Sequence, residues 1–362
     1  MDSSSLSEYM SRTVENIVNH TIKSTLKNPK ETAFLMKYMF TAKKAAAKRQ
    51  RSEKAGLHIP PFLIASITKS CNLRCSGCYA RELHSCSDGV RNSQLTWERW
   101  EEVFGEAEDL GISFILLAGG EPLMRRDVVV KAADRKNIIF PIFTNGLLID
   151  DFYIDLFKKN RNLLPVLSIE GYQEETDQRR GQGTYRALLE VMSRLNDNGI
   201  VYGTSVTVTT QNVGEVSDKK FIDILSNMGC KIIFYVEYVP AEEGTYYLAP
   251  TEKERESLAE RLKELRSEYK DILFLSFPGD EKATGGCLAA GRGFFHINSD
   301  GGAEPCPFSP QSDTNLGEVS LKDALKSPLF LRLDSGGLLM GDHKGGCMLF
   351  EKKAEVDALT GL

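Results

Sequence analysis

The chain has 362 residues, of which 41% are hydrophobic and 26% are charged, and its formal net charge is −5. This composition is typical of a globular protein, and the chain is longer than one ordinary domain. The negative net charge argues against a nucleic-acid-binding protein. The longest apolar runs, such as residues 138–143, are far shorter than the roughly 20 residues that span a bilayer. The first ten residues lack the basic and apolar regions of a secretory signal, so we expect a cytoplasmic protein, in which clustered cysteines indicate metal or catalytic sites.

Residues 1–57 are predicted to form a basic helical extension. Apolar residues recur at helical spacing between positions 34 and 39, and the run KKAAAKRQR (43–51) has a high helix propensity. Pro60 ends the helix because proline cannot continue it. We interpret the basic face as a solvated helix surface, and contact with an anionic partner or the surface of a membrane is the alternative.

Residues 58–280 alternate between short apolar runs and amphipathic segments. The expected strands are 62–67, 113–118, 138–143, 164–169, 203–209 and 231–237. The expected helices are 96–109, 126–135, 150–159, 184–197, 216–228 and 251–269. This alternation predicts an α/β protein with a parallel sheet, in the form of a partial (β/α)6 TIM-like barrel. Catalytic groups of such barrels lie at the carboxyl ends of the strands.

Residues 281–362 have a different composition. Glycine is abundant there, as in TGGCLAAGRGFF and SGGLLMGDHKGGC, and the alternation of helices and strands weakens. We predict a small, loop-rich C-terminal domain that binds a metal cluster. A hairpin is expected in FFHINSDGGAEPC, because the SDGG segment supplies turn residues.

Three of the eight cysteines in the chain lie in one short segment, TKSCNLRCSGCYA (68–80). Thiolates are the ligands that iron–sulfur clusters prefer, and Cys71, Cys75 and Cys78 could hold three of the four irons of a [4Fe–4S] cluster. The fourth iron would then remain open to a substrate or cofactor. A zinc site is the alternative, with His84 or Cys86 as the fourth ligand.

The spacing Cys71-x3-Cys75-x2-Cys78 resembles the cluster motif of the radical S-adenosylmethionine enzymes (radical SAM enzymes). In that family the open iron binds the amino and carboxylate groups of S-adenosylmethionine. This chain departs from the family in one respect, since Gly77 occupies the position directly before the third cysteine, where an aromatic residue is common, and Tyr79 follows the cysteine. That departure bears on how the adenine packs near the cluster.

Four later motifs extend the resemblance. LLAGGEPL (116–123) is similar to the family's GGE motif, which contacts the methionine amino group, and FTNG (143–146) follows the third expected strand. LSIEG (167–171) ends the fourth strand and an arginine follows it, in positions that the family uses for ribose and carboxylate contacts. Thr207, Thr209 and Glu237 are expected at the ends of strands five and six. The cofactor-binding residues implied by the resemblance are Gly119, Gly120, Glu121, Pro122, Asn145, Ser168, Glu170 and Arg180.

The cysteines of the C-terminal region resemble the first half of the auxiliary-cluster extension called SPASM, or its shorter relative twitch. The resemblance implies one auxiliary [4Fe–4S] cluster held by Cys287, Cys306 and Cys347, with a fourth position that is open or held by a residue such as Asp342 or His343. Three purely structural cysteines are the alternative. Cys230 is predicted to be a buried residue that behaves as a small apolar side chain.

The resemblance also implies a chemistry. An electron from a donor such as flavodoxin or ferredoxin cleaves S-adenosylmethionine at the first cluster, and the resulting 5′-deoxyadenosyl radical abstracts a hydrogen atom from the substrate. A peptide or protein is the favoured substrate. The alternatives are a small molecule or lipid at a membrane surface, or a non-catalytic iron–sulfur carrier. No carboxylate in the sequence stands out as a catalytic base.

Overall fold

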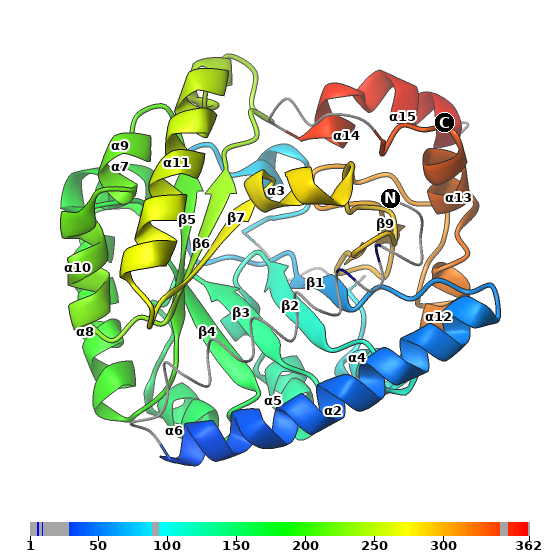
Figure 1. Cartoon of the computed structure of the whole chain (residues 1–362), viewed down its shortest axis with the longest axis horizontal. Helices are drawn as coiled ribbons and strands as arrows, with labels where there is room; N and C mark the ends of the chain where they lie inside the picture. The colour runs from blue at the N-terminus through cyan, green and yellow to red at the C-terminus, as the bar shows by residue number, and fades with distance from the viewer. Residues whose placement is uncertain (1–5, 7–8, 10–28, 89–93, 341–346, 361–362) are drawn as a thin grey trace.

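The computed structural model describes residues 6, 9, 29–88, 94–340 and 347–360 (Figure 1). Most of the first half of the predicted N-terminal extension therefore lies outside the described residues, as do Asp342 and His343. Among the described residues, no helix combines the length and the hydropathy needed to cross a bilayer.

The centre of the molecule is a parallel sheet that confirms the predicted α/β class. Its strands are β1 (Phe62–Thr68), β2 (Phe114–Gly119), β3 (Phe140–Thr144), β4 (Leu163–Ser168), β5 (Gly203–Val208), β6 (Ile232–Glu237) and β7 (Leu273–Phe277). Each of these strands pairs in parallel with the next. The first six agree with the expected strands to within about two residues, whereas β7 was not predicted. Because all of the strands run in one direction, their carboxyl ends meet at one edge of the sheet.

Helices connect the strands, and several of them begin at a residue whose side chain caps the first turn. They are α4 (Trp97–Leu110), α5 (Arg126–Asp134), α6 (Asp151–Lys159), α7 (Gln173–Arg180), α8 (Thr184–Asp197), α9 (Val213–Val216), α10 (Lys219–Asn227) and α11 (Glu252–Glu268). The side chain of Thr96 accepts from the N–H of Arg99 at the start of α4, and Thr251 forms a capping box with Glu254 at the start of α11. Gly111 ends α4 with a left-handed backbone.

Two apolar layers lie on the two faces of the sheet. The outer layer packs the strands against the surrounding helices and forms the main core. The inner layer fills part of the barrel interior with Val166, Ile232 and Phe234 and with partly buried Phe143 and Leu275. The inner surface of strands β3 to β7 is therefore partly lined by apolar side chains.

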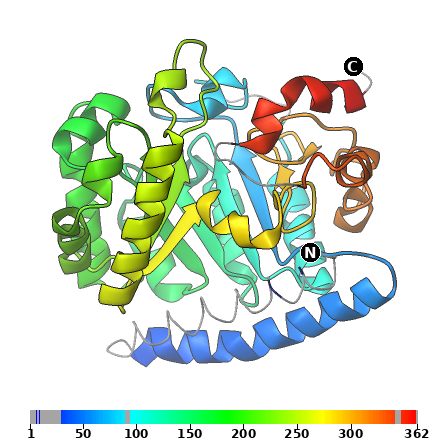
Figure 2. The same ribbon diagram turned by 45° about the horizontal axis from the view of Figure 1, so that its top comes forward.

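The N-terminal helix α2 (Pro29–Lys54) closes the base of the barrel. Its Tyr38 is 1% exposed, belongs to an apolar cluster with Ile139 and Phe114, and donates a hydrogen bond of 2.6 Å to the carbonyl oxygen of Ser113. These partners lie at the amino ends of the strands, and Figures 1 and 2 show α2 running along that side of the molecule. The helix therefore lies at the end of the barrel opposite to the carboxyl ends of the strands.

The C-terminal region joins the sheet instead of forming a separate body. The predicted hairpin is present as β8 (His296–Ile297) and β9 (Ala303–Glu304), and β8 pairs in parallel with β1, so the sheet order is β7-β6-β5-β4-β3-β2-β1-β8-β9. The chain ends in α12 (Leu321–Ala324), α13 (Pro328–Ser335), α14 (Met348–Glu351) and α15 (Lys353–Thr360). Leu329, Phe330 and Leu349 belong to the same core as the barrel strands.

Candidate active site at the carboxyl ends of the strands

The first cysteine triplet lies in the loop that follows β1. Cys71, Cys75 and Cys78 are partly exposed free thiols, and Cys78 immediately precedes the short helix α3 (Tyr79–Glu82). A hydrogen bond from Cys86 lowers the pKa of Cys71 to about 6, against the opposing effect of burial. Burial raises the pKa of Cys75, the positive charge of Arg180 opposes this shift, and negative charge on Cys78 and Cys71 adds to it. The loop therefore presents three neighbouring thiols to the carboxyl edge of the sheet.

A zinc site was the alternative to an iron–sulfur cluster at this loop. Within the described ranges, no three Cys, His, Asp or Glu side chains converge as the ligands of a single metal ion would. Cys86, one of the two candidates for a fourth zinc ligand, forms a hydrogen bond with Cys71.

Glu170 and Arg180 form a buried ion pair beside Cys75. Glu170 is 1% exposed and lies just beyond the carboxyl end of β4, while Arg180 is the last residue of α7. Arg180 donates from Nε to Glu170 Oε1 at 2.9 Å, and its Nη1 lies 4.0 Å from Cys75 Sγ. Glu170 also accepts the N–H of Thr207 from β5 at 2.9 Å. One carboxylate thus joins two strand ends and holds a cation against the cysteine loop.

Gly119 and Gly120 allow the cysteine loop to approach the end of β2. A Cβ on Gly119 would lie 2.3 Å from the carbonyl oxygen of Thr68, and one on Gly120 would lie 2.2 Å from that of Ser70. The close approach permits backbone hydrogen bonds of 2.8 Å from Gly120 to Thr68 and from Glu121 to Ser70. The resemblance implies that both glycines are cofactor-binding residues. In the structure they make room for the backbone of the loop that carries the cysteines.

Glu121 connects the ends of β2 and β3. Its carboxylate is 1% exposed and accepts hydrogen bonds from Thr144 Oγ1 at 2.7 Å, from the N–H of Asn145 at 2.8 Å and from the N–H of Leu123 at 3.0 Å. Burial raises the pKa of Glu121 to about 7, and these hydrogen bonds oppose the shift. Three of about four acceptor positions are therefore occupied within the protein.

The other expected cofactor-binding residues also lie at the carboxyl edge of the sheet. Asn145 donates from Nδ2 to Asn72 Oδ1 at 2.8 Å and so ties β3 to the cysteine loop. Pro122 is buried at the start of a 3-10 turn (Pro122–Met124). Ser168 ends β4, and its hydroxyl lies 3.2 Å from that of Ser205. The structure thus brings together the predicted residues that follow β1, β2, β3 and β4.

The C-terminal cysteines form a second group. The thiols of Cys306 and Cys347 share a hydrogen bond, which lowers the pKa of Cys347 and raises that of Cys306 well above its usual range. Burial raises the pKa of Cys287, and the charges of Glu281 and Cys347 act in the same direction. The three thiols therefore gather at one place, although they are far apart in the sequence, as an auxiliary cluster would require. Glu281 is a buried carboxyl beside them that sequence reasoning missed.

The two cysteine groups lie on the same side of the molecule. Tyr79 directly follows Cys78, Phe308 follows Cys306 by two residues, and the two rings make an edge-to-face contact with centroids 4.7 Å apart. Burial raises the pKa of Tyr79, and negative charge on Cys78 and on Cys306 raises it further. The Tyr79–Phe308 contact therefore joins the loop after β1 to the C-terminal region.

A buried polar chain, which sequence reasoning also missed, lies between β1 and the C-terminal hairpin. His296 is 2% exposed, and its ring nitrogens lie 2.7 Å from Ser66 Oγ and 2.6 Å from Glu304 Oε2. Asn298 donates to the other oxygen of Glu304 at 2.5 Å. The sequence contains little indication of this polar chain, because His296 and Glu304 become neighbours only when the hairpin pairs and β8 docks beside β1.

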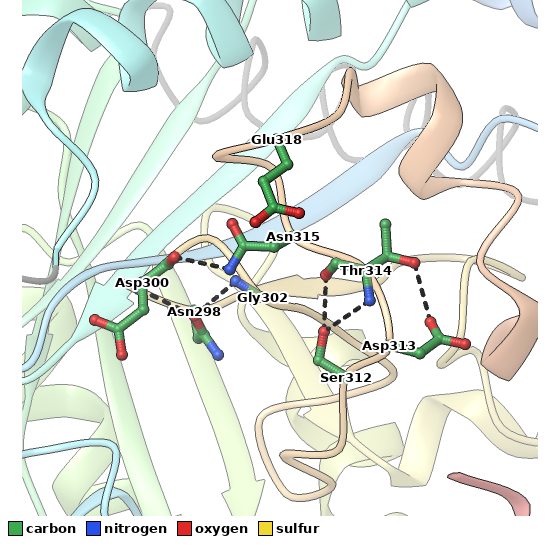
Figure 3. Close-up of a pocket in the computed structure, with 8 residues that line it drawn as sticks. All are labelled: Asn298, Asp300, Gly302, Ser312, Asp313, Thr314, Asn315 and Glu318. Atoms are coloured by element: carbon green, nitrogen blue, oxygen red, sulfur yellow. Dashed lines mark hydrogen bonds between the residues drawn. The ribbon is translucent and has the colours of Figure 1, made fainter. Parts of the chain in front are cut away.

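A polar pocket of about 360 Å³ lies on the hairpin turn (Figure 3). It is lined by Asn298, Asp300, Gly302, Ser312, Asp313, Thr314, Asn315 and Glu318. Asn298 Oδ1 accepts from the N–H groups of Asp300 and Gly302, and Asn315 donates to the Asp300 carbonyl oxygen at 3.1 Å. Asp313 caps the start of α13 through the N–H of Leu329 at 2.7 Å. The hydrogen bonds of these groups stabilise the turns to which they belong, and none of the cysteines lines the pocket.

Comparison with known proteins agrees with this arrangement. The family model for the radical SAM superfamily matches residues 65–228. Fe-coproporphyrin III synthase of Methanosarcina barkeri is 29% identical over 188 residues, which cover 51% of this chain and only 46% of that protein. PqqA peptide cyclase of Rhizobium meliloti is 27% identical over 262 residues, which cover 68% of each chain.

The fold has close counterparts among solved structures. Streptococcus suis SuiB bound to its precursor peptide SuiA superimposes with a TM-score of 0.65 at 21% identity, covering 88% of this chain and 77% of SuiB. SuiB bound to S-adenosylmethionine gives a TM-score of 0.64 at 19% identity, with coverage of 85% and 71%. The family binds a [4Fe–4S] cluster and S-adenosylmethionine, and the cysteine loop, the GGE segment and the strand ends described above agree with it. Residues 65–228 of this chain therefore match the radical SAM superfamily, and the fold of the chain resembles that of SuiB.

Proposed function

We propose that this protein is a radical SAM enzyme that modifies a peptide or protein. The observation that carries the proposal is the presence of two separate groups of three thiols, joined by the Tyr79–Phe308 contact, at the carboxyl edge of the sheet. We assign Cys71, Cys75 and Cys78 to the first cluster, and Cys287, Cys306 and Cys347 to one auxiliary cluster.

The first cluster and S-adenosylmethionine would together supply a 5′-deoxyadenosyl radical that removes a hydrogen atom from the substrate. The residues of this chain position the reactants and exclude water. Glu170 holds Arg180 against the cysteine loop, and Glu121 fixes the ends of β2 and β3 beneath it. The apolar inner layer of the barrel and the helix α2 at its base keep solvent away from the opposite side.

Two features support a peptide substrate. The likeness to PqqA peptide cyclase covers 68% of both chains. The fold also extends over 88% of this chain in SuiB, whose structure holds a precursor peptide.

We assign residues 1–57 to the basic helical extension, 58–280 to the barrel and 281–362 to the auxiliary-cluster domain. We expect an electron donor such as flavodoxin or ferredoxin to approach the side that carries the cysteines. The basic helix α2 lies at the opposite end of the barrel, so it is a poor docking site for that donor.

The first experiment measures iron and sulfide in anaerobically reconstituted protein, together with 5′-deoxyadenosine formed under reduction. We expect about eight irons in the wild type and about four in the Cys71/Cys75/Cys78→Ala variant, as two [4Fe–4S] clusters require. A Cys287/Cys306/Cys347→Ala variant should also lose about four irons. A Cys230→Ala variant is the matched control and should keep all of them. If the wild type holds about four irons and the first variant nearly none, the assignment of an auxiliary cluster is refuted.

The substrate class is tested by isotope transfer. Fractions of peptides, lipids and small metabolites from fully deuterated cells are incubated separately with the reduced enzyme and S-adenosylmethionine. Deuterium should enter 5′-deoxyadenosine, detected by mass spectrometry, with the peptide fraction. Transfer from the lipid or metabolite fraction alone would refute the peptide assignment while leaving the radical chemistry in place.

A further inference from the structure

The outward side of helix α2 lies at the end of the barrel opposite to the cysteines. The helix has 26 residues, which make it about 39 Å long, and Figure 2 shows it along the outer boundary of the molecule. We define its outer face by six side chains that reach the surface: Met36, Lys37, Phe40, Lys43, Lys44 and Arg51. At 3.6 residues per turn, these positions lie within about 120° of the helix circumference. They therefore form one continuous surface.

The inward side of α2 is anchored on the barrel. Glu31 is 4% exposed, and its Oε2 lies 3.1 Å from Nη1 of Arg161. Arg49 is 2% exposed, and its Nη1 donates to Ser113 Oγ at 3.2 Å. Glu53, the other acid of the helix, lies 2.7 Å from Nδ1 of His58. Both acids of α2 are thus engaged by neighbours within the protein, and the charged side chains of the outer face are all basic.

The charge of the chain is strongly segregated. Helix α2 contains eight Lys and Arg residues and two Glu residues, a net charge of +6, whereas the whole chain carries −5 and the remainder therefore carries −11. An anionic surface attracts α2 and repels the rest of the molecule. Since such forces act within a Debye length of about 8–10 Å, they favour an orientation in which the outer face is turned toward that surface.

The apolar residues of the outer face indicate what kind of anionic surface it fits. Met36 is 54% exposed, Phe40 is 68% exposed, and the two lie one turn apart on the same side of the helix. The phosphates of a nucleic acid offer these side chains no apolar partner. A helix at a lipid surface buries such side chains at the boundary between headgroups and acyl chains, while its lysines meet the lipid phosphates. The convex face of a single helix also suits a fluid surface.

We propose that the outer face of α2 docks this protein on an anionic membrane surface. Lys37, Lys44 and Arg51 contact lipid phosphates, and Met36 and Phe40 enter the boundary between headgroups and acyl chains. The carboxyl edge of the sheet, with both groups of cysteines, then faces away from the lipid. Substrate and electron donor reach the site from the aqueous side, so the lipid is an anchoring surface and not the substrate. This inference goes beyond the proposed function and is independent of the substrate class.

The test is flotation of the full chain with vesicles of phosphatidylcholine alone or with about 30% phosphatidylglycerol. The wild type should bind only the anionic vesicles, and binding should weaken as the salt rises from about 0.05 to 0.5 M. The Lys37/Lys44/Arg51→Gln variant should lower the partition coefficient about 100-fold, about five-fold for each cation. Lys253/Arg261/Lys263→Gln is the matched control, since it removes three exposed cations from α11. It should change binding about two-fold at most.

The apolar contribution is tested by Met36/Phe40→Ala, which keeps the net charge. This variant should lower the partition coefficient about 10-fold. Its circular dichroism and unfolding midpoint should match those of the wild type, because both side chains are exposed. Partition equal to that of the wild type would show that no side chain enters the lipid, and would refute the assigned orientation.

Other outcomes also overturn the proposal. Failure of the wild type to bind anionic vesicles removes the membrane contact, and an equal loss in the α2 and α11 variants shows that net charge acts without the outer face. Binding of polyglutamate or duplex DNA that is lost in the α2 variant, without binding of vesicles, identifies a macromolecular polyanion as the partner instead. None of these results depends on the formation of 5′-deoxyadenosine, so a failure here is distinguishable from a failure of the proposed function.

Discussion

Replacing Glu170 by Gln should destabilise the protein strongly, because this carboxylate is the negative partner of two arginines. Glu170 lies 3.3 Å from Nη1 of Arg179 and 2.9 Å from Nε of Arg180, and its own side chain is 2% exposed. Gln keeps the shape of the side chain but leaves two guanidinium groups in a largely buried site without a counter-charge. It also weakens the acceptor of the Thr207 N–H.

The expected loss is about 3–5 kcal/mol of the free energy of unfolding, the usual effect of removing one partner from a buried ion pair. A second consequence follows at the cysteine loop. Arg180 lies 4.0 Å from Cys75 Sγ and is held there by Glu170, so the reconstituted variant should bind its first cluster less tightly and lose iron faster to a chelator.

The assay is urea unfolding of the cluster-free protein, followed by circular dichroism, together with the rate of iron loss from the reconstituted protein. Glu190→Gln is the control, because Glu190 pairs with Arg186 at 3.3 Å on the surface, where the two side chains are 67% and 86% exposed. That substitution should cost at most about 1 kcal/mol. A cost below about 1 kcal/mol for Glu170→Gln, equal to that of the control, would refute the reasoning that the buried pair holds the loop in place.

Two further predictions concern the end of β2. Gly119→Ala should lower the unfolding midpoint and the iron content, because the added Cβ would lie 2.3 Å from a carbonyl oxygen of the cysteine loop. Gly181→Ala is its control, since Gly181 also has a positive φ, of +109°, but has nothing within 4 Å, and an equal effect of both changes would contradict the close-approach argument. Burial raises the pKa of Glu121 to about 7, so the folded protein binds more protons than the unfolded chain between about pH 4.5 and 7 and the free energy of unfolding should fall as the pH rises through that range. Glu121→Gln should flatten this part of the stability profile of the cluster-free protein, and an unchanged slope in urea unfolding would show that another group is responsible.

Much of the fold could be predicted from local patterns. The six expected strands and the helices α4, α5, α6, α8 and α11 lie within about two residues of the observed ones, because apolar periodicity and capping residues act over short distances. The expected helix at 216–228 is divided by Asp218, which caps α10 and separates it from α9. The strand β7 was not predicted, and the docking of β8 beside β1 has no local signal, since their pairing joins residues more than 200 positions apart.

The candidate site also has one part that the sequence could predict and one part that it could not. The first triplet could be identified from one segment, because a loop must hold its three thiols within a few residues of each other. The grouping of Cys287, Cys306 and Cys347 depended on a resemblance, and the structure brings these thiols together through the hairpin and the start of α14. Glu281 is the buried carboxyl beside Cys287.

The sequence by itself determined the class of the protein, the cysteine loop and the order of the motifs along the strands, because each of these depends on residues that are close together in the chain. Only the tertiary structure decided how the carboxyl ends of different strands meet. It showed that Glu170 pairs with the arginines of α7, that Ser66, His296 and Glu304 form one buried chain, and that Tyr238 fills the space beside Gly77. These contacts arise when strands that are distant in sequence become neighbours in one sheet, and the spacing of residues along the chain carries no record of them.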